Sequence, residues 1–349
     1  MNPRTANPST ASVSRREFVK ATAGAAGLLV GLGAQAAAEG EKKPKPAARA
    51  KVSCVSWCFH SFEAGADPSE ALDILGKLGF EGTELILNAR QDIERLWTDA
   101  NIDKIRKKLE KNKLELAQFV IFQPVVEGLS SLDPEERKRS LDYFEAGCKI
   151  GKKLGAPMIN VVSQWARELK GPSDYLPRYY EVPDAKPGEK YTIKIAPGFD
   201  WGKIWSQYIE TTKACLERTK AHGMKFSIEQ HTHCVIPDAS SFLLLWDAIR
   251  DPALGYNLDA GWTLLQREYP PVAIHKVKDH LVNLHVRDID GLMRTFVHIG
   301  EGVMDFKAIA DALKAIGFQG FLSLEQDKHP GDMQAVAKRY LETMKQYLG

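Results

Sequence analysis

The sequence has few cysteines, and their spacing suggests neither a disulfide framework nor a cysteine-bound metal. The 349 residues include only five, an odd number without C-x-x-C spacing. Cys54 and Cys58 lie four residues apart on a predicted strand, about 13 Å along it, which is too far for a disulfide. We therefore expect buried thiols at Cys54, Cys58, Cys148, Cys215 and Cys234.

A nucleotide fingerprint and a membrane-spanning segment are also lacking. No G-x-G-x-x-G follows the first predicted strand, so a dinucleotide site is not supported. The apolar stretch at residues 21–33 is rich in Gly and Ala, and it falls short of the ~20 residues that span a bilayer. We expect no permanent membrane anchor.

The N-terminal residues instead have the pattern of an export signal. Residues 14–20 read Ser-Arg-Arg-Glu-Phe-Val-Lys and directly precede the apolar stretch, as in a twin-arginine signal. We predict a signal peptide over residues 1–38, a solvated linker over 39–51 and a single catalytic domain over 52–349. The protein would then be periplasmic or otherwise exported, with the twin-arginine translocation machinery as a partner.

Basic charge is scarce outside this signal. The chain has a formal charge of +2, and the segment up to residue 38 contributes four positive charges and one negative charge, so the remainder is near −1. Proteins that bind nucleic acid need a positively charged surface to neutralise phosphates. A nucleic-acid partner is therefore not expected.

What the chain does have is a regular alternation of short apolar segments with longer amphipathic ones, which is typical of parallel βα units. Several of the amphipathic segments end at a Gly suited to a left-handed helix cap. Eight strands are predicted, and eight is the count of a (β/α)8 TIM barrel of the α/β class. The predicted strands cover residues 51–58, 82–87, 114–122, 158–163, 225–230, 255–258, 281–286 and 321–324.

One connection, residues 165–200, is much longer than the others. It follows the fourth strand and contains Trp165 and several tyrosines, and such aromatic content disfavours disorder. Long loops in compact domains are often lids or binding loops. We predict a lid or a sugar-stacking surface that includes Trp165, with a subunit contact in a homo-oligomer as the alternative.

The last four predicted strands each finish in a potential metal ligand. These residues are Glu229, Asp259, His285 and Glu325, and the C-terminal strand ends of a TIM barrel meet at one face, where active sites lie. A single such carboxylate can simply cap a helix or pair with Arg, but three together are costly to bury without a cation. Because the ligands are mostly hard oxygens, we predict one divalent ion, with Mn, Mg or Co favoured and Zn tolerated.

Five segments around these strand ends form a recognisable set: Ile228-Glu229-Gln230-His231, Leu258-Asp259-Ala260-Gly261, Leu284-His285-Val286-Arg287-Asp288, Ile299-Gly300-Glu301-Gly302-Val303-Met304-Asp305-Phe306 and Ser323-Leu324-Glu325. The set resembles the sugar phosphate isomerase/epimerase family of xylose isomerase-like TIM barrels, which shares its fold with apurinic endonucleases. The endonucleases hold two more zinc ions through residues whose positions are occupied here by Trp262, Arg294 and Phe296. The resemblance therefore implies a mononuclear site and disfavours DNA repair.

The resemblance also implies the chemistry, in which the metal polarises a ketone and an adjacent hydroxyl while a carboxylate removes the α-hydrogen. Glu229 and Glu325 are the candidate bases. His231 is a candidate acid for a leaving group, with a hydrogen bond to a metal ligand as the alternative. The candidate substrate contacts are Trp262, Arg287, His298, Glu84 and Trp165, of which Trp262 could instead pack at the rim of the barrel and Glu84 could instead bind Arg or water.

Export favours an unphosphorylated substrate, because sugar phosphates are scarce outside the cytoplasm. After proton abstraction beside the carbonyl of a keto-sugar, reprotonation would make the protein an isomerase or epimerase. Elimination of an aglycone would make it a 3-keto-glycoside lyase. A catalytically inactive sugar-binding protein is the alternative of another class, although the complete set of four ligands favours an enzyme.

Overall fold

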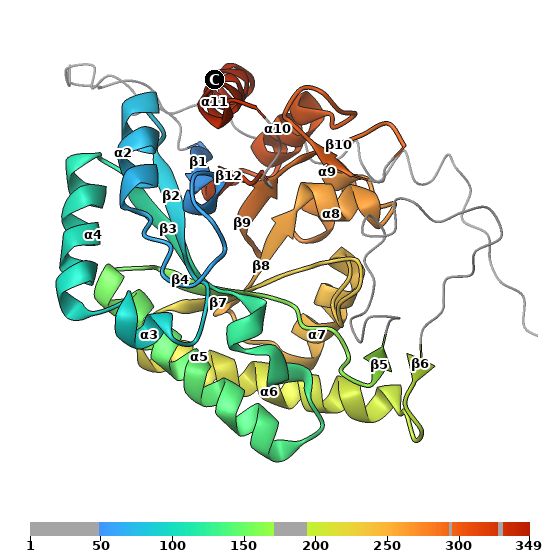
Figure 1. Cartoon of the computed structure of the whole chain (residues 1–349). Helices are drawn as coiled ribbons and strands as arrows, with labels where there is room; N and C mark the ends of the chain where they lie inside the picture. Colours follow the sequence, from blue (N-terminus) through green and yellow to red (C-terminus); the bar gives the residue numbers. More distant parts are fainter. Residues whose placement is uncertain (1–48, 171–193, 293–294, 327–330) are drawn as a thin grey trace, which may run out of the picture. The chain divides into compact units, whose positions relative to one another are not determined.

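A computed structural model describes residues 49–170, 194–292, 295–326 and 331–349 (Figure 1). The predicted signal over 1–38, most of the predicted linker over 39–51, the centre of the 165–200 connection and Arg294 lie outside the described residues. Within the described ranges, no helix combines the length and the apolar character that crossing a membrane requires.

Eight parallel strands close into a barrel in the order β1-β12-β9-β8-β7-β4-β3-β2, so each strand pairs with its neighbours along the chain and β12 pairs with β1. The predicted TIM barrel is therefore confirmed, and every barrel strand overlaps a predicted one. The strands are β1 (Lys51–Val55), β2 (Gly82–Leu87), β3 (Glu115–Ile121), β4 (Met158–Val162), β7 (Lys225–Glu229), β8 (Leu254–Asp259), β9 (Leu281–Val286) and β12 (Phe321–Leu324).

Amphipathic helices surround the barrel (Figure 1), because each buries one apolar stripe against the strands. The glycines predicted to end four helix-strand connections, Gly79, Gly155, Gly223 and Gly317, all have a positive φ between 68° and 86°, a conformation that costs Gly little. The principal helices are α2 (Ser69–Leu78), α4 (Asp99–Lys111), α5 (Pro134–Leu154), α6 (Trp201–Ala221), α7 (Ala239–Ile249), α10 (Phe306–Ala315) and α11 (Met333–Leu348).

Several short elements were not predicted, because elements of two to seven residues show no clear periodicity. Three of them bear on the site: η1 (Ser56–Cys58) follows β1, while α8 (Ala260–Leu265) and β10 (Asp288–Ile289) follow β8 and β9. The others are α3 (Asp92–Arg95), α9 (Pro270–Lys276), η2 (Gln123–Val125), η3 (Glu127–Ser130), β11 (Phe296–Val297), which pairs with β10, and the pair β5 (Leu169–Lys170) and β6 (Lys194–Ile195).

The start of the barrel differs from the prediction in two respects. Ala50 is already buried, and Arg49 forms an ion pair with Glu81 at 3.0 Å, so the ordered packing begins before Val52. The first strand ends at Val55 rather than Cys58, and η1 then bends the chain.

The five cysteines are buried thiols, as predicted. The separation along a straight strand does not apply to the first two, however, because η1 turns the chain between them. Burial raises the pKa of the Cys54 thiol, and its hydrogen bond with the nearby Cys58 thiol raises it further.

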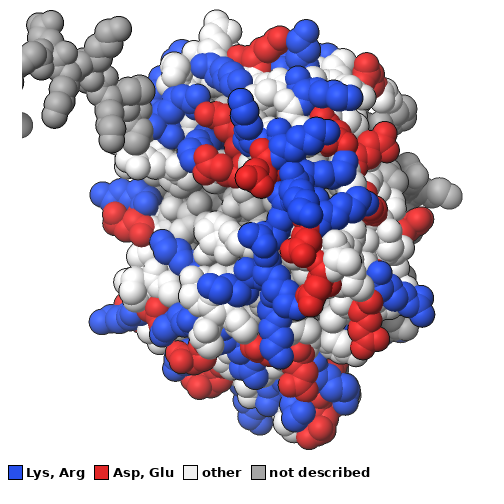
Figure 2. Space-filling model, turned by 90° about the vertical axis from the view of Figure 1, so that its left-hand side faces the viewer, with Lys and Arg blue, Asp and Glu red and all other residues white. Residues whose placement is uncertain are grey.

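The outer surface along α2 and α4 carries charges of both signs. In Figure 2 the basic residues form a band with acidic residues beside it. Lys104 pairs with Asp67 at 3.0 Å, and Lys108 pairs with Asp73. These pairs link the α4 helix to α2 and to the segment before it.

Candidate active site

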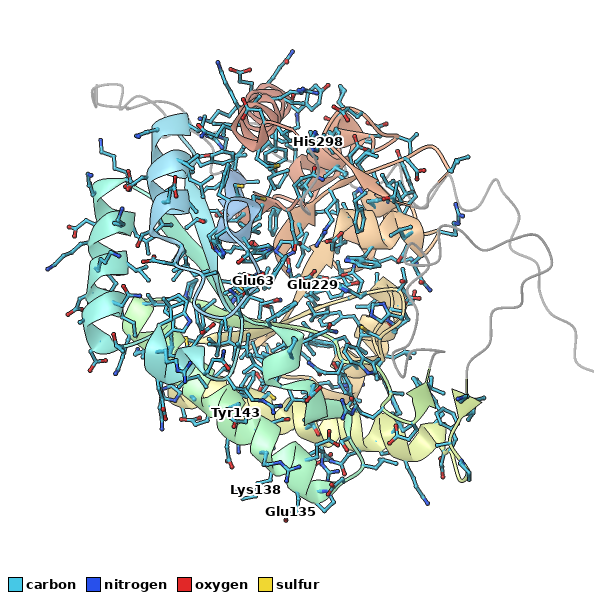
Figure 3. All side chains as sticks on the ribbon, viewed as in Figure 1. Glu63, Glu135, Lys138, Tyr143, Glu229 and His298 are labelled. Carbon is cyan, nitrogen blue, oxygen red and sulfur yellow. The ribbon has the colours of Figure 1, made fainter. Side chains whose placement is uncertain are left out.

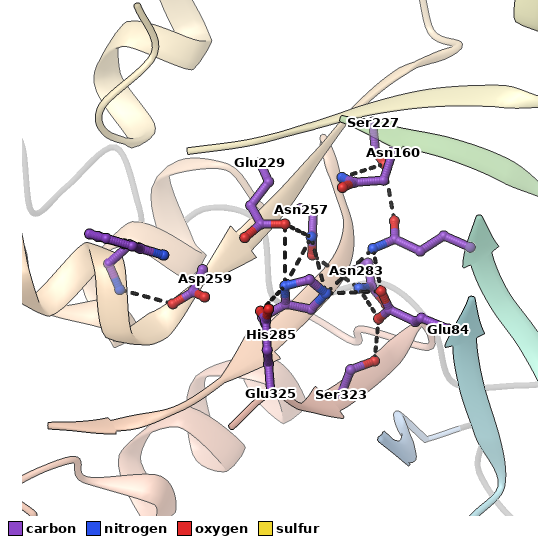
Figure 4. Close-up of polar contacts among 12 residues, drawn as sticks. Glu84, Asn160, Ser227, Glu229, Asn257, Asp259, Asn283, His285, Ser323 and Glu325 are labelled. Carbon is purple, nitrogen blue, oxygen red and sulfur yellow. Dashed lines mark hydrogen bonds and ion pairs between the residues drawn. The ribbon is translucent and has the colours of Figure 1, made fainter. Parts of the chain in front are cut away.

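The four predicted metal ligands come together at the C-terminal ends of the barrel strands (Figure 4). Glu229 ends β7, Asp259 ends β8, His285 lies in β9 and Glu325 follows β12. One ligand atom from each lies within 4.8 Å of the others, and all four side chains are buried. The convergence expected from the barrel topology is therefore present.

Both the spacing and the chemistry of these atoms fit a divalent ion. Bonds of about 2.0–2.2 Å to oxygen and nitrogen place opposite ligands roughly 4 Å apart, which agrees with the limit of 4.8 Å. Burial raises the pKa of Glu229 to about 7 and also raises the pKa of Asp259. The protein thus holds carboxylates that resist ionisation unless a cation is close.

Arg287 supplies part of the compensating charge. Its Nε donates to Asp259 Oδ2 at 2.7 Å, and its Nη2 lies 2.6 Å from Glu325 Oε1. Burial opposes ionisation of Glu325, but Arg287 and then His285 outweigh it and hold the pKa of Glu325 below its ordinary value. Trp57 Nε1 also donates to Glu325 Oε1, at 3.0 Å. Two donors therefore fix the orientation of this carboxylate.

A layer of polar side chains fills the barrel beneath the ligands, where TIM barrels more often carry branched aliphatic residues. Its centre is Glu84 of β2, which is fully buried. Glu84 accepts hydrogen bonds from His285 Nε2 at 2.9 Å, from Gln118 Nε2 at 2.7 Å and from Asn283 Nδ2 at 2.8 Å, and also one from Ser323 Oγ.

This geometry corrects the predicted role of Glu84. Both of its oxygens are occupied by donors and the side chain has no exposed surface, so contact with a substrate does not fit its position. Instead Glu84 holds the Nε2 side of His285, which leaves Nδ1 directed at Glu325 Oε2 at 2.8 Å and at Glu229 Oε2 at 3.3 Å. A carboxylate behind a histidine ligand in this way orients the ring and raises its basicity.

Other members of the polar layer position the remaining ligands, and sequence reasoning missed them. Asn257 Nδ2 donates to Glu229 Oε2 at 2.9 Å. Gln230 Nε2 donates to the backbone oxygen of Asp259 at 2.8 Å, and Asp259 itself caps α8. The available signal was the recurrence of Asn, Gln and Ser at inward-facing positions of strands that are otherwise apolar.

His231 and Trp262 form a stacked pair beside Glu229. Their ring centroids are 4.2 Å apart with an interplanar angle of 26°, and His231 Nε2 lies 3.2 Å from Glu229 Oε1. Trp262 is only 1% exposed, and its other contacts include the edge of Phe296. Of the two roles considered for Trp262, its position agrees better with packing at the barrel rim.

A cavity of about 570 Å³ opens onto the ligands, and it is bordered by Glu229, Glu325, His231, Trp262 and Arg287. Trp165 and His298 are not among the residues that line it. Trp165 lies near His233, with ring centroids 6.3 Å apart, and His298 lies beside Gly331. Figure 3 shows Glu229 near the barrel centre and His298 farther out, towards α10.

Asp288 organises the Gly-Glu-Gly turn that follows β11. Its Oδ2 accepts hydrogen bonds from the backbone nitrogens of Gly300 at 2.9 Å and Gly302 at 3.0 Å, and its Oδ1 accepts one from Met304 at 3.0 Å. A Cβ atom at position 302 would lie 2.2 Å from Asp288 Oδ1. This close approach explains the glycine, and it gives the recognisable turn a structural role.

The sequence matches the model of the xylose isomerase-like TIM barrel family over residues 72–347. The chain belongs to this family. A search of curated proteins gave no match.

Solved structures of this xylose isomerase-like fold include three that illustrate the chemistry found on it. D-psicose 3-epimerase from Clostridium cellulolyticum H10 is 17% identical, with 85% of this chain and 99% of that chain covered and a TM-score of 0.66. 3-keto-D-glucoside 4-epimerase from E. coli is 14% identical, with 85% of this chain and 100% of that chain covered and a TM-score of 0.64. A probable 3-DHS dehydratase from Bacillus anthracis is 16% identical, with 84% of this chain and 98% of that chain covered and a TM-score of 0.62.

At these identities the structural likeness shows the shared fold. The assignment to the family rests on the family match, which covers residues 72–347.

Proposed function

We propose that the protein is a divalent-metal-dependent isomerase or epimerase that abstracts the proton α to the carbonyl of an unphosphorylated keto-sugar. The observation that supports this most strongly is the convergence of four potential ligand residues, of which Glu229 and Glu325 line the cavity. When bound by Glu229, Asp259, His285 and Glu325, a divalent ion such as Mn, Mg or Co, with Zn as a further candidate, would polarise the carbonyl and so acidify the neighbouring C–H bond.

Glu229 and Glu325 are the proposed bases, and they reach the cavity from different strands. The Oε1 atom of Glu229 faces His231, while Oε2 faces His285 and Asn257. Glu325 is oriented by Trp57 and by Arg287. Epimerisation requires removal of a proton from one face of a carbon and delivery to the other, which two carboxylates on separate strands can provide.

The cavity also supports an unphosphorylated substrate. Among the described residues that line it, Arg287 is the one with a permanent positive charge, and its guanidinium already contacts Asp259 and Glu325. Tight phosphate binding usually uses several charge-assisted donors. The proposed exported location agrees with such a substrate, and cell fractionation of the full-length protein would test that location.

A 3-keto-glycoside lyase is the second candidate, because it would begin with the same proton abstraction. His231 lines the cavity beside Glu229, where it could protonate the oxygen of a departing aglycone. A catalytically inactive sugar-binding protein, the remaining alternative, would perform neither reaction.

The deciding experiment is incubation of the metal-reconstituted protein in deuterated water with a ketose and, separately, with a 3-keto-glycoside. We expect solvent deuterium in the recovered sugar, whereas release of the aglycone would instead identify the lyase. The matched control is Glu325→Gln, which keeps the shape of the side chain but removes the base. Full activity of this variant would contradict the role of Glu325, and a lack of both reactions with every divalent ion would refute the proposed function.

A further inference from the structure

The cavity has two chemically different sides. On one side lie four polar or charged residues from the part of the barrel between β7 and β12. Glu229 ends β7 and His231 follows it, Arg287 follows β9, and Glu325 follows β12. The strands β2, β3 and β4 on the opposite side contribute three aliphatic residues, Ile86, Val120 and Val162. The residues of these three strands that line the cavity are therefore all aliphatic, whereas Glu84 and Gln118 of β2 and β3 are not among the lining residues.

Three aromatic rings extend this apolar side, and we refer to Trp57, Phe62 and Phe122 as the aromatic wall. Phe62 and Phe122 are stacked, with centroids 5.2 Å apart and an angle of 22°, and the Trp57 ring lies 6.4 Å from Phe62. Phe62 is 38% exposed, which is unusual for a ring that borders a buried polar site. Trp57 reaches Glu325 through its indole nitrogen, so the aromatic wall begins at the metal ligands.

Three polar residues, Gln123, Ser61 and Glu63, also line the cavity. Gln123 directs its amide nitrogen at the backbone oxygen of Ser163 at 3.1 Å. Ser61 and Glu63 belong to the loop after η1 that also carries Phe62, and both Glu63 and Glu229, which Figure 3 labels, line the cavity.

We propose that the aromatic wall binds an apolar, preferably aromatic, aglycone, so that the substrate is a keto-glycoside rather than a free keto-sugar. This inference rests on the proposed function. A free sugar carries a hydroxyl on nearly every carbon, and hydroxyls pressed against Ile86, Val120 and Val162 would lose their hydrogen bonds to water without replacement. An aglycone ring has no such loss and gains aromatic contacts.

The size of the cavity agrees with a substrate of two parts. Cavities of about 300–1,000 Å³ hold drug-sized ligands, and the volume of about 570 Å³ lies within this range. A single hexose is much smaller than such a ligand. The sugar would lie against Glu229 and Glu325 while the aglycone contacts Phe62 and Phe122.

The test compares methyl and p-nitrophenyl 3-keto-glucosides as substrates, and the corresponding glucosides without the keto group as binding probes. For the wild-type protein we expect at least tenfold tighter binding and higher kcat/KM for the p-nitrophenyl compounds. Phe62→Ala should reduce this ratio by about tenfold, because it removes an exposed ring that stacks with Phe122. The matched control is Trp201→Ala, since Trp201 is 46% exposed and lies on α6, outside the cavity lining.

Each outcome has a distinct meaning. Equal affinity and equal kcat/KM of the wild-type protein for the methyl and p-nitrophenyl compounds would overturn the inference, because the aglycone would then gain no contact. An equal loss for both compounds in Phe62→Ala would also overturn it, because the aromatic wall would then stack on the sugar itself. An absence of deuterium exchange and of aglycone release with every substrate would instead refute the proposed function. Calorimetric binding of the unreactive glucosides separates these cases, since it does not depend on catalysis.

Discussion

Replacement of Glu84 by Gln should weaken metal binding even though residue 84 contacts no predicted ligand except His285. All four partners of Glu84 are donors, from His285, Gln118, Asn283 and Ser323. A glutamine offers one oxygen and one NH₂ group, so its NH₂ group must face donors. If it faces His285, the imidazole proton has to move from Nε2 to Nδ1, the nitrogen that points at Glu325 and Glu229.

The expected loss of affinity is about 10- to 100-fold, the usual effect of removing a partner behind a histidine ligand. This corresponds to about 1.4–2.8 kcal/mol at 1.4 kcal/mol per tenfold change. Titration calorimetry of the metal-free protein with Mn²⁺ at fixed pH would measure it. Thermal unfolding of the same samples would show whether the variant remains folded.

The control is Ser323→Ala, which removes one donor to Glu84 but leaves the contact between Glu84 and His285. We expect its metal affinity to stay within about threefold of the wild type, because the tautomer of His285 is unaffected. If Glu84→Gln is folded and binds Mn²⁺ as tightly as the wild type, then the charge of Glu84 does not orient His285 and the reasoning is wrong.

Three further predictions concern single contacts. Trp57→Phe keeps an aromatic ring but removes the donor to Glu325, and should lower the rate of deuterium exchange about tenfold, whereas an unchanged rate would show that this hydrogen bond is dispensable. Asp288→Asn places an amide against backbone donors and should destabilise the fold by about 3 kcal/mol in urea unfolding, and an unchanged midpoint would contradict the role given to that carboxylate. In the metal-free protein, burial raises the pKa of Glu229 from 4.5 to about 7, so its contribution to stability is complete below pH 4.5 and is lost as the pH rises through about 7. Melting temperatures of Glu229→Gln should therefore depend less on pH between 5 and 7 than those of the wild type, and parallel curves would exclude this contribution.

The barrel and the clustering of the four candidate ligands could be predicted from sequence because both depend on local patterns. Each buried parallel strand is a short apolar run, and Gly residues mark the ends of the preceding helices. Once eight such units are counted, the barrel topology alone places the ends of β7, β8, β9 and β12 at one face. No distance needs to be known for Glu229 and His285 to be recognised as neighbours.

The polar layer inside the barrel could not be predicted in the same way, because its contacts cross the barrel. Asn283 and Glu84 are 199 residues apart in the chain and meet only through the closed sheet. The position of Glu84 in the middle of β2 also determines its depth. Ile86, two residues further along the same face, lines the cavity instead, and this is why the predicted substrate contact at Glu84 was misplaced.

Closure of the barrel has a consequence for the order of events during folding. His285 meets Glu84 across 201 residues, and β1 pairs with β12 across nearly the whole described chain. Contacts of such long sequence separation form late, because the entropy of closing a large loop must be overcome first. The proposed metal site therefore needs the completed ring for Glu84 to orient His285, and metal uptake during refolding would test whether it forms only when the last strand joins the first.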